Sequence, residues 1–302
     1  MKKTNMAKKG LMPAVLGAVC SVVALTSVSY AWFTMGNTGS VNEIDVKVGA
    51  ADGMQLSVDA SSWKSEITVD ELKGITTNQM LEGVEIMPVS TDGSVTNGAL
   101  SFFEGQLTSK GDAVLGLSTT SHYMMFDLYV KVDNKYPLQL ASGSTVTGVS
   151  AKPVHYATRV AFVDLGCDET NDPDTSKGLD GDGVESSFIW EPNADIHTDA
   201  AQNQYKVSAN QKIASYNAIS GITGESPVAN GFYATTTKSI SSNLQTSVNG
   251  FDGAKDILQL EAGTNKVRVY IWVEGQDVDC LNDVSGTTFK TKLDFSIPKV
   301  SE

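Results

Sequence analysis

Apolar and polar residues alternate along much of the chain, and this period of two predicts β-strands with one buried face. In the clearest run, apolar residues occupy every second position from Val267 to Val273. Long stretches with a helical period are scarce. The alternation predicts strands in six regions, at 44–48, 54–58, 124–132, 158–162, 267–273 and 289–297.

Strands of this kind pair in antiparallel sheets that pack one face and leave the other in water. Two such sheets stacked face to face bury both apolar sides. We therefore expect an all-β protein, an antiparallel β-sandwich of jelly-roll type with long loop insertions. A few short helices are expected, at 69–72 and 199–204.

The middle of the chain has a different composition. Residues 166–212 are rich in Asp, Gly, Asn and Pro, and residues 213–250 are rich in Ser, Thr, Asn and Gly. Such segments are typical of loops, and their apolar content is too low for a separate core. We interpret 166–250 as loop-rich insertions on a single domain that spans 32–302.

The first 31 residues have the layout of a secretory signal peptide. Four lysines precede an apolar run at 11–28, which is followed by the small-x-small triplet of Ser29, Tyr30 and Ala31. Cleavage there would make Trp32 the first residue. The alternative is an uncut membrane anchor, since about 20 apolar residues span a bilayer; Pro13 and several hydroxyl side chains in the run weaken it.

The charge balance is acidic. The whole chain has a net charge of -13; residues 1–31 hold four lysines and no acid, so residues 32–302 have 18 basic and 35 acidic side chains, a net charge of -17. Such a surface repels nucleic-acid phosphates and anionic lipid headgroups. We expect no nucleic-acid partner, and membrane contact only through an uncleaved signal segment.

Two cysteines, Cys167 and Cys280, follow the signal segment. In an oxidising compartment such a pair can form a disulfide. Both come after strand-like runs and beside acidic residues, which would allow a shared sheet edge. The sequence leaves a disulfide and two free thiols equally open.

Several acidic residues gather in the 166–190 region, and Ca²⁺ prefers carboxylate and carbonyl oxygens. Their spacing does not match the EF-hand pattern, so a solvated loop is favoured over a calcium site and no cofactor is expected. The carboxylates that a calcium ion would use are Asp172, Asp174, Asp180 and Asp182.

Catalytic signatures are missing from the sequence. It contains no G-x-S-x-G elbow, no Walker loop and no H-E-x-x-H zinc motif. The three histidines, His122, His155 and His197, have no metal-ligand spacing. We therefore expect a protein without enzymatic activity.

Two parts of the chain resemble a known family. The segment TSVSYAWFT at 26–34, followed by a polar spacer and by strands around IDVKV and MQLSV, resembles the TasA/camelysin family of secreted Gram-positive surface proteins. VRVYIWVEGQDVDC and KTKLDFSI resemble closing strands of related exported proteins. The long acidic insertion and the cysteine pair depart from that pattern.

The resemblance implies a secreted jelly-roll subunit at the surface of a Gram-positive bacterium, which polymerises into fibres of a biofilm matrix. In such fibres the N-terminal segment of one subunit forms a strand in its neighbour's sheet. The alternative is that this segment forms the first strand of its own sandwich. The donor would span 32–48 and bury Trp32, Phe33, Met35, Ile44, Val46 and Val48.

The expected partner is therefore a second copy of the chain, with other matrix proteins or the cell wall as further partners. One rival is a secreted binding module for glycans or a host surface, with Trp190, Tyr270 and Trp272 as exposed stacking platforms. A metal-dependent hydrolase is a second, weaker rival.

Overall fold

The computed structural model describes the strands and their main connections. The described residues are 44–51, 53–80, 86–107, 113–117, 122–148, 154–182, 187–193, 196–205, 244–246, 253–275, 277, 279–280 and 289–298. Among them, no helix is long and apolar enough to cross a bilayer.

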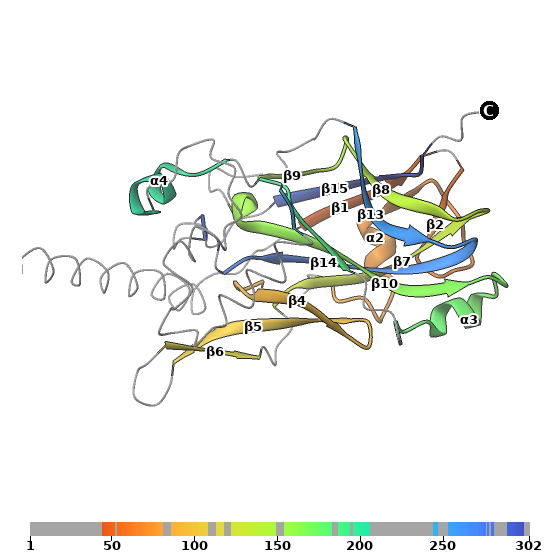
Figure 1. The fold of residues 1–302 in the computed structure, drawn as a ribbon, viewed down its shortest axis with the longest axis horizontal. Helices are drawn as coiled ribbons and strands as arrows, with labels where there is room; N and C mark the ends of the chain where they lie inside the picture. Colours follow the sequence, from red (N-terminus) through yellow and green to blue (C-terminus); the bar gives the residue numbers. More distant parts are fainter. Residues whose placement is uncertain are drawn as a thin grey trace, which may run out of the picture.

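The described strands form three sheets, which lie as successive layers (Figure 1). The first has the order β13 (Ala254–Leu260), β8 (Tyr136–Ala141), β15 (Phe289–Ser296), β1 (Ile44–Ala50) and β3 (Glu66–Thr68), with β9 (Thr145–Gly148) also pairing with β15. The second has the order β12 (Leu244–Thr246), β11 (Ser187–Glu191), β10 (Thr158–Asp168), β14 (Gly263–Val273), β7 (Met124–Val132) and β2 (Gln55–Ser57). The third is β4 (Ser90–Thr96), β5 (Ala99–Leu107) and β6 (Ala113–Leu117).

The main core lies between the first two sheets. Alternate residues of β14, such as Val269 and Ile271, are fully buried there, and they face Leu293 and Phe295 of β15 across the core. The all-β antiparallel sandwich predicted from the alternation is confirmed. The strand order does not establish the jelly-roll type, because β1–β15 and β11–β12 pair in parallel.

The second sheet is buried on both faces, which the sequence analysis did not predict. Tyr270 and Trp272 point away from the main core and pack in a second cluster with Phe102 of β5. Farther along β14, Lys266 donates to the carbonyls of Lys177 (2.8 Å) and Leu179 (2.7 Å), at the C-terminal end of a short helix. The face expected to be wet is thus covered by the third sheet and by this helix.

Helices are few and short. They are α2 (Val69–Lys73), α3 (Pro173–Gly178), α4 (Asp199–Tyr205) and the 3-10 turn η1 (Val154–Ala157). The helices expected at 69–72 and 199–204 are confirmed as α2 and α4. α2 begins with a capping box between Thr68 and Glu71.

The region 166–250, interpreted from the sequence as loop-rich insertions, contains a strand of the second sheet. β11 within this region pairs with β10, from Trp190 opposite Val160 to Ser187 opposite Val163. Trp190 is fully buried. Low apolar content hid a strand because its few large side chains are concentrated in five residues.

The tip of the β4–β5 hairpin packs against the segment that follows α3. Asn97 and Gly98 both have positive φ, 49° and 68°, as a tight two-residue turn with this dipeptide requires. Gly98 packs directly on Gly181, and a Cβ on Gly98 would lie 2.2 Å from the Asp180 carbonyl oxygen. The backbone of the hairpin tip therefore contacts the backbone at 180–181 directly, because neither Gly98 nor Gly181 has a side chain.

We predict that Gly98→Ala lowers the free energy of unfolding by about 2–4 kcal/mol, because the new Cβ clashes and the backbone is left-handed. The measurement is urea denaturation followed by fluorescence. Gly178→Ala is the matched control, since a Cβ there meets nothing within 4 Å, and it should be neutral or slightly stabilising. Equal effects of the two variants would contradict the close approach.

Candidate functional site

The N-terminal strand β1 occupies a slot in the first sheet. It runs parallel to β15, from Ile44 opposite Phe289 to Ala50 opposite Phe295, and antiparallel to β3. Two backbone bonds extend this pairing, from the Ala50 amide to the Ser65 carbonyl (2.9 Å) and from the Ala51 amide to the Phe295 carbonyl (3.0 Å). We call the space between β15 and β3 the strand slot.

The inner face of the strand slot is apolar. Val48 is fully buried, and its register partners Ile67 and Leu293 on either side are buried with it in the main core. Removing β1 would uncover these side chains and leave the backbone groups of β15 that face β1 without partners, while the pairing of β15 with β8 and β9 would remain. A strand must therefore fill the slot.

The outer face of the slot is charged. Lys47 Nζ lies 2.8 Å from Glu66 Oε2 on β3, and both side chains are about half exposed. The hydrogen bond and the charge of Glu66, with a smaller contribution from Asp294 on β15, raise the pKa of Lys47. The inner face of the slot thus contacts β1 through apolar side chains, and its outer face contacts β1 through charged ones.

The structure places part of the expected donor segment in the chain's own sheet. Ile44, Val46 and Val48 all belong to β1, which is the alternative considered for this segment. The remaining donor residues Trp32, Phe33 and Met35 lie outside the described residues, and so do the cleavage-site residues Ser29 and Ala31.

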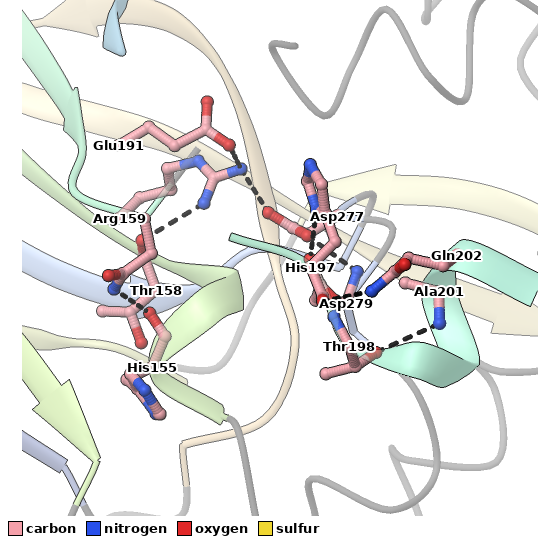
Figure 2. A network of polar contacts seen from close by, with 11 residues as sticks. His155, Thr158, Arg159, Glu191, His197, Thr198, Ala201, Gln202, Asp277 and Asp279 are labelled. Carbon is pink, nitrogen blue, oxygen red and sulfur yellow. Dashed lines mark hydrogen bonds and ion pairs between the residues drawn. The ribbon is translucent and has the colours of Figure 1, made fainter. Parts of the chain in front are cut away.

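A buried ionic cluster lies at one end of the second sheet (Figure 2). Arg159 of β10 is fully buried and contacts Glu191 at the end of β11 and Asp277 beyond β14. Its Nη1 also donates to the Thr158 carbonyl oxygen (3.1 Å). Nearby, Glu274 is fully buried and accepts a hydrogen bond from the Trp272 indole (3.1 Å).

A second buried pair continues this cluster toward α4. His197 Nδ1 lies 2.7 Å from Asp279 Oδ2, while Asp279 Oδ1 accepts from the Thr198 amide (2.8 Å). Asp279 is joined to Asp277 through its own amide, which donates to Asp277 Oδ1 (2.8 Å). Burial raises the pKa of Asp279, and the hydrogen bond from His197 opposes that shift.

This arrangement ties four segments that are far apart in the sequence. Arg159, Glu191, His197 and Asp277 come from β10, β11, the start of α4 and the segment after β14. Among the described residues, no group of three or more His, Cys, Asp and Glu side chains is arranged to hold a metal ion. We interpret the cluster as a structural one, a clamp in the sense that its ion pairs hold these four segments together.

The sequence analysis missed the cluster. The signal was an arginine inside the apolar run of β10, where a charge is rarely buried without a partner. Its partners lie 32 and 118 positions away, so no local pattern could identify them.

The two cysteines cannot form a disulfide in this fold, and both are free. Cys167 lies opposite Asn265 at one end of the β10–β14 ladder, whereas Cys280 follows Asp277, which contacts Arg159 at the other end. About eight residues of strand separate these ends, roughly 25 Å, far beyond disulfide reach. Of the two possibilities that the sequence left open, the structure has the free thiols, because the length of β10 keeps the two cysteines at opposite ends of the sheet.

Neither thiol is activated. Burial and the charges of nearby carboxylates, Glu169 foremost, raise the pKa of Cys167 to about 11. Burial likewise raises the pKa of Cys280. A thiol with a raised pKa is a poor nucleophile.

Two of the four calcium candidates accept local backbone hydrogen bonds. Asp172 caps α3 by accepting from the amides of Asp174 (3.0 Å) and Thr175 (2.9 Å), and Asp180 accepts from the Asp182 amide (3.0 Å). Asp172, Asp174, Asp180 and Asp182 are exposed. The carboxylates of Asp172 and Asp180 follow capping and turn rules.

The expected glycan platforms are not on the surface. Trp190 and Trp272 are fully buried and Tyr270 is 2% exposed. The expectation of exposed aromatics was wrong because the third sheet covers Tyr270 and Trp272, while Trp190 faces the main core.

No protein-family model, curated protein or solved structure matches this chain. The family resemblance noted in the sequence therefore remains a prediction.

We predict that Arg159→Leu lowers the free energy of unfolding by about 3–5 kcal/mol, because it leaves buried carboxylates without their cation. Chemical denaturation measures the change. The control Lys135→Met removes an exposed ion pair with Glu261 and should cost less than about 1 kcal/mol. A similar small loss for both variants would show that Arg159 is not a clamp.

We also predict a pH dependence from His155 in η1, whose Nδ1 is buried without a hydrogen-bond partner. Burial lowers the pKa of His155 from 6.5 to about 4. Between these two pKa values the unfolded chain binds a proton at His155 and the folded chain does not. The contribution of His155 to the free energy of unfolding is therefore fully present above pH 6.5 and is lost as the pH falls from 6.5 to about 4.

The measurement is the free energy of unfolding of wild type and His155→Phe across this range. The stability of wild type relative to the variant should drop by about 1–3 kcal/mol on acidification, after allowance for solvent screening. The raised pKa of Asp279 makes the folded protein more stable as the pH falls, which is opposite to the effect of His155. This contribution is the same in wild type and variant, so it cancels when the two are compared. Parallel pH profiles would contradict the prediction.

Proposed function

We propose that this protein is a secreted structural subunit that assembles into extracellular fibres by placing β1 in the strand slot of a neighbouring copy. The observation that carries the proposal is the parallel pairing of β1 with β15. This strand is the first described element, and it completes the core through Val48. The same sequence can fill the slot from its own chain or from another chain.

The connection to the rest of the fold fits such an exchange. Residues 51–54 link β1 to β2, which belongs to the second sheet. Gly53 in this link has a φ of 87°, a conformation that glycine adopts without strain. A change of backbone path in this short link would redirect β1 to a neighbour.

A donated strand makes a head-to-tail contact, and a head-to-tail contact that does not close on itself gives an open filament. The segment before β1 holds Trp32, Phe33 and Met35, which would add apolar surface to the contact. The sequence signs of export favour a place outside the cell, and the family resemblance implies the surface of a Gram-positive bacterium, with other matrix proteins or the cell wall as further partners. A binding module is less favoured because its proposed aromatic platforms are buried.

The Lys47–Glu66 pair provides a test, because it joins the donated strand to the slot. Lys47→Glu alone and Glu66→Lys alone place like charges at every contact, within or between copies. In a mixture, an exchanged contact between one variant and the other places opposite charges side by side. We expect the mixture to give about two- to fivefold more filaments at low salt than either variant alone.

Filament mass is measured by sedimentation and negative-stain microscopy of the purified secreted protein. High salt should remove the difference, because it screens exposed charges. If β1 stays in its own chain, mixing changes nothing, and that result would refute the proposal.

A further inference from the structure

The outer face of the strand slot contains a carboxylate that is held between two glycines. Asp294 of β15 lies opposite Gly49 of β1, and a Cβ on Gly49 would be 3.2 Å from Asp294 Oδ1. On the other side, a Cβ on Gly143 would be 2.1 Å from Asp294 Oδ2. We call this arrangement the Asp294 notch.

The carboxylate in the notch is fixed in place. Its Oδ2 accepts a hydrogen bond from Lys292 Nζ (2.5 Å). The backbone of Asp294 is also tied on both sides to Ser144, whose Oγ accepts from the Asp294 amide (2.9 Å) and donates to its carbonyl oxygen (3.2 Å). A side chain at the position of Gly49 would therefore meet a group that has little freedom to move away.

The apolar pattern of β1 does not choose among registers that differ by two residues, because such a shift keeps the same side chains facing the core. A shift in one direction would put Lys47 opposite Asp294, and a shift in the other would put Ala51 there. Both residues have a Cβ, and a Cβ at this position would lie 3.2 Å from Asp294 Oδ1, a tight contact that requires the carboxylate to shift by a few tenths of an ångström. Gly49 is the one glycine in β1.

We propose that the Asp294 notch selects both the register and the identity of the strand that enters the slot. It admits a segment with a glycine opposite Asp294 and a basic residue two positions earlier, beside Glu66. The partner is thus a second copy of this chain, joined with Gly49 of the donor opposite Asp294 of the acceptor. This inference rests on the proposed strand exchange.

The test mixes two full-length secreted preparations that carry different C-terminal affinity tags and measures the fraction of mixed copies that co-purify. Wild-type copies should exchange and co-purify. Gly49→Val copies mixed only with one another should co-purify about as well as wild type, because the valine meets Asp294 in the chain's own slot and in a neighbour's slot alike.

Complementary variants separate a steric block from a general loss of folding. Gly49→Val copies mixed with Asp294→Ala copies should co-purify about tenfold more than Gly49→Val copies alone. The exchanged contact then has room for the valine, whereas the valine's own slot does not, and overpacking of this kind costs about one decade in an equilibrium constant. Lys290→Ala is the matched acceptor control, since Lys290 is an exposed residue on the same strand, and it should give no gain.

The outcomes distinguish the two proposals. If wild-type copies do not exchange, the proposed function fails, and the register inference fails with it. If wild-type copies exchange but Gly49→Val copies co-purify no better with Asp294→Ala copies than with one another, the notch does not select the strand, although the proposed function stands. An equal gain with Lys290→Ala copies would also overturn the inference.

Discussion

Burial of the second sheet on both faces is the constraint on which the rest of the structure depends. Its central strands β10 and β14 put Phe162 and Val269 into the main core and put Val163 and Trp272 into the second cluster. Strands buried in this way have no wet face on which to place charge. Polar groups on them must find protein partners, since an unpaired buried charge is costly.

The ionic cluster and the capped helix are consequences of that burial. Arg159 is paired with Glu191 and Asp277, and Lys266 satisfies carbonyls at the end of α3. These contacts join the ends of the second sheet to segments that the sheet hydrogen bonds do not reach. A buried ion pair adds little net stability, so its main effect is to define how those segments are placed.

The first sheet differs because its outer face remains partly in water. Lys47, Glu66 and Asp294 can there carry a charge pattern without full desolvation. Val48 contributes burial on the inner face of the same strand. The apolar inner face of β1 makes a contact stable, and its charged outer face makes the contact selective. For this reason β1 is the element that we connect with assembly.

The sequence by itself determined the all-β class, the positions of most long strands and the short helices α2 and α4, because alternation and capping depend on neighbouring residues. It did not reveal the third layer: Tyr270 and Trp272 alternate in the same way whether water or β5 covers them. It left open whether Cys167 and Cys280 form a disulfide. They do not, because the length of β10 separates them. The partners of Arg159 and the glycine notch at Asp294 were likewise decided by tertiary structure, since they join residues that the chain brings together only when its sheets pack.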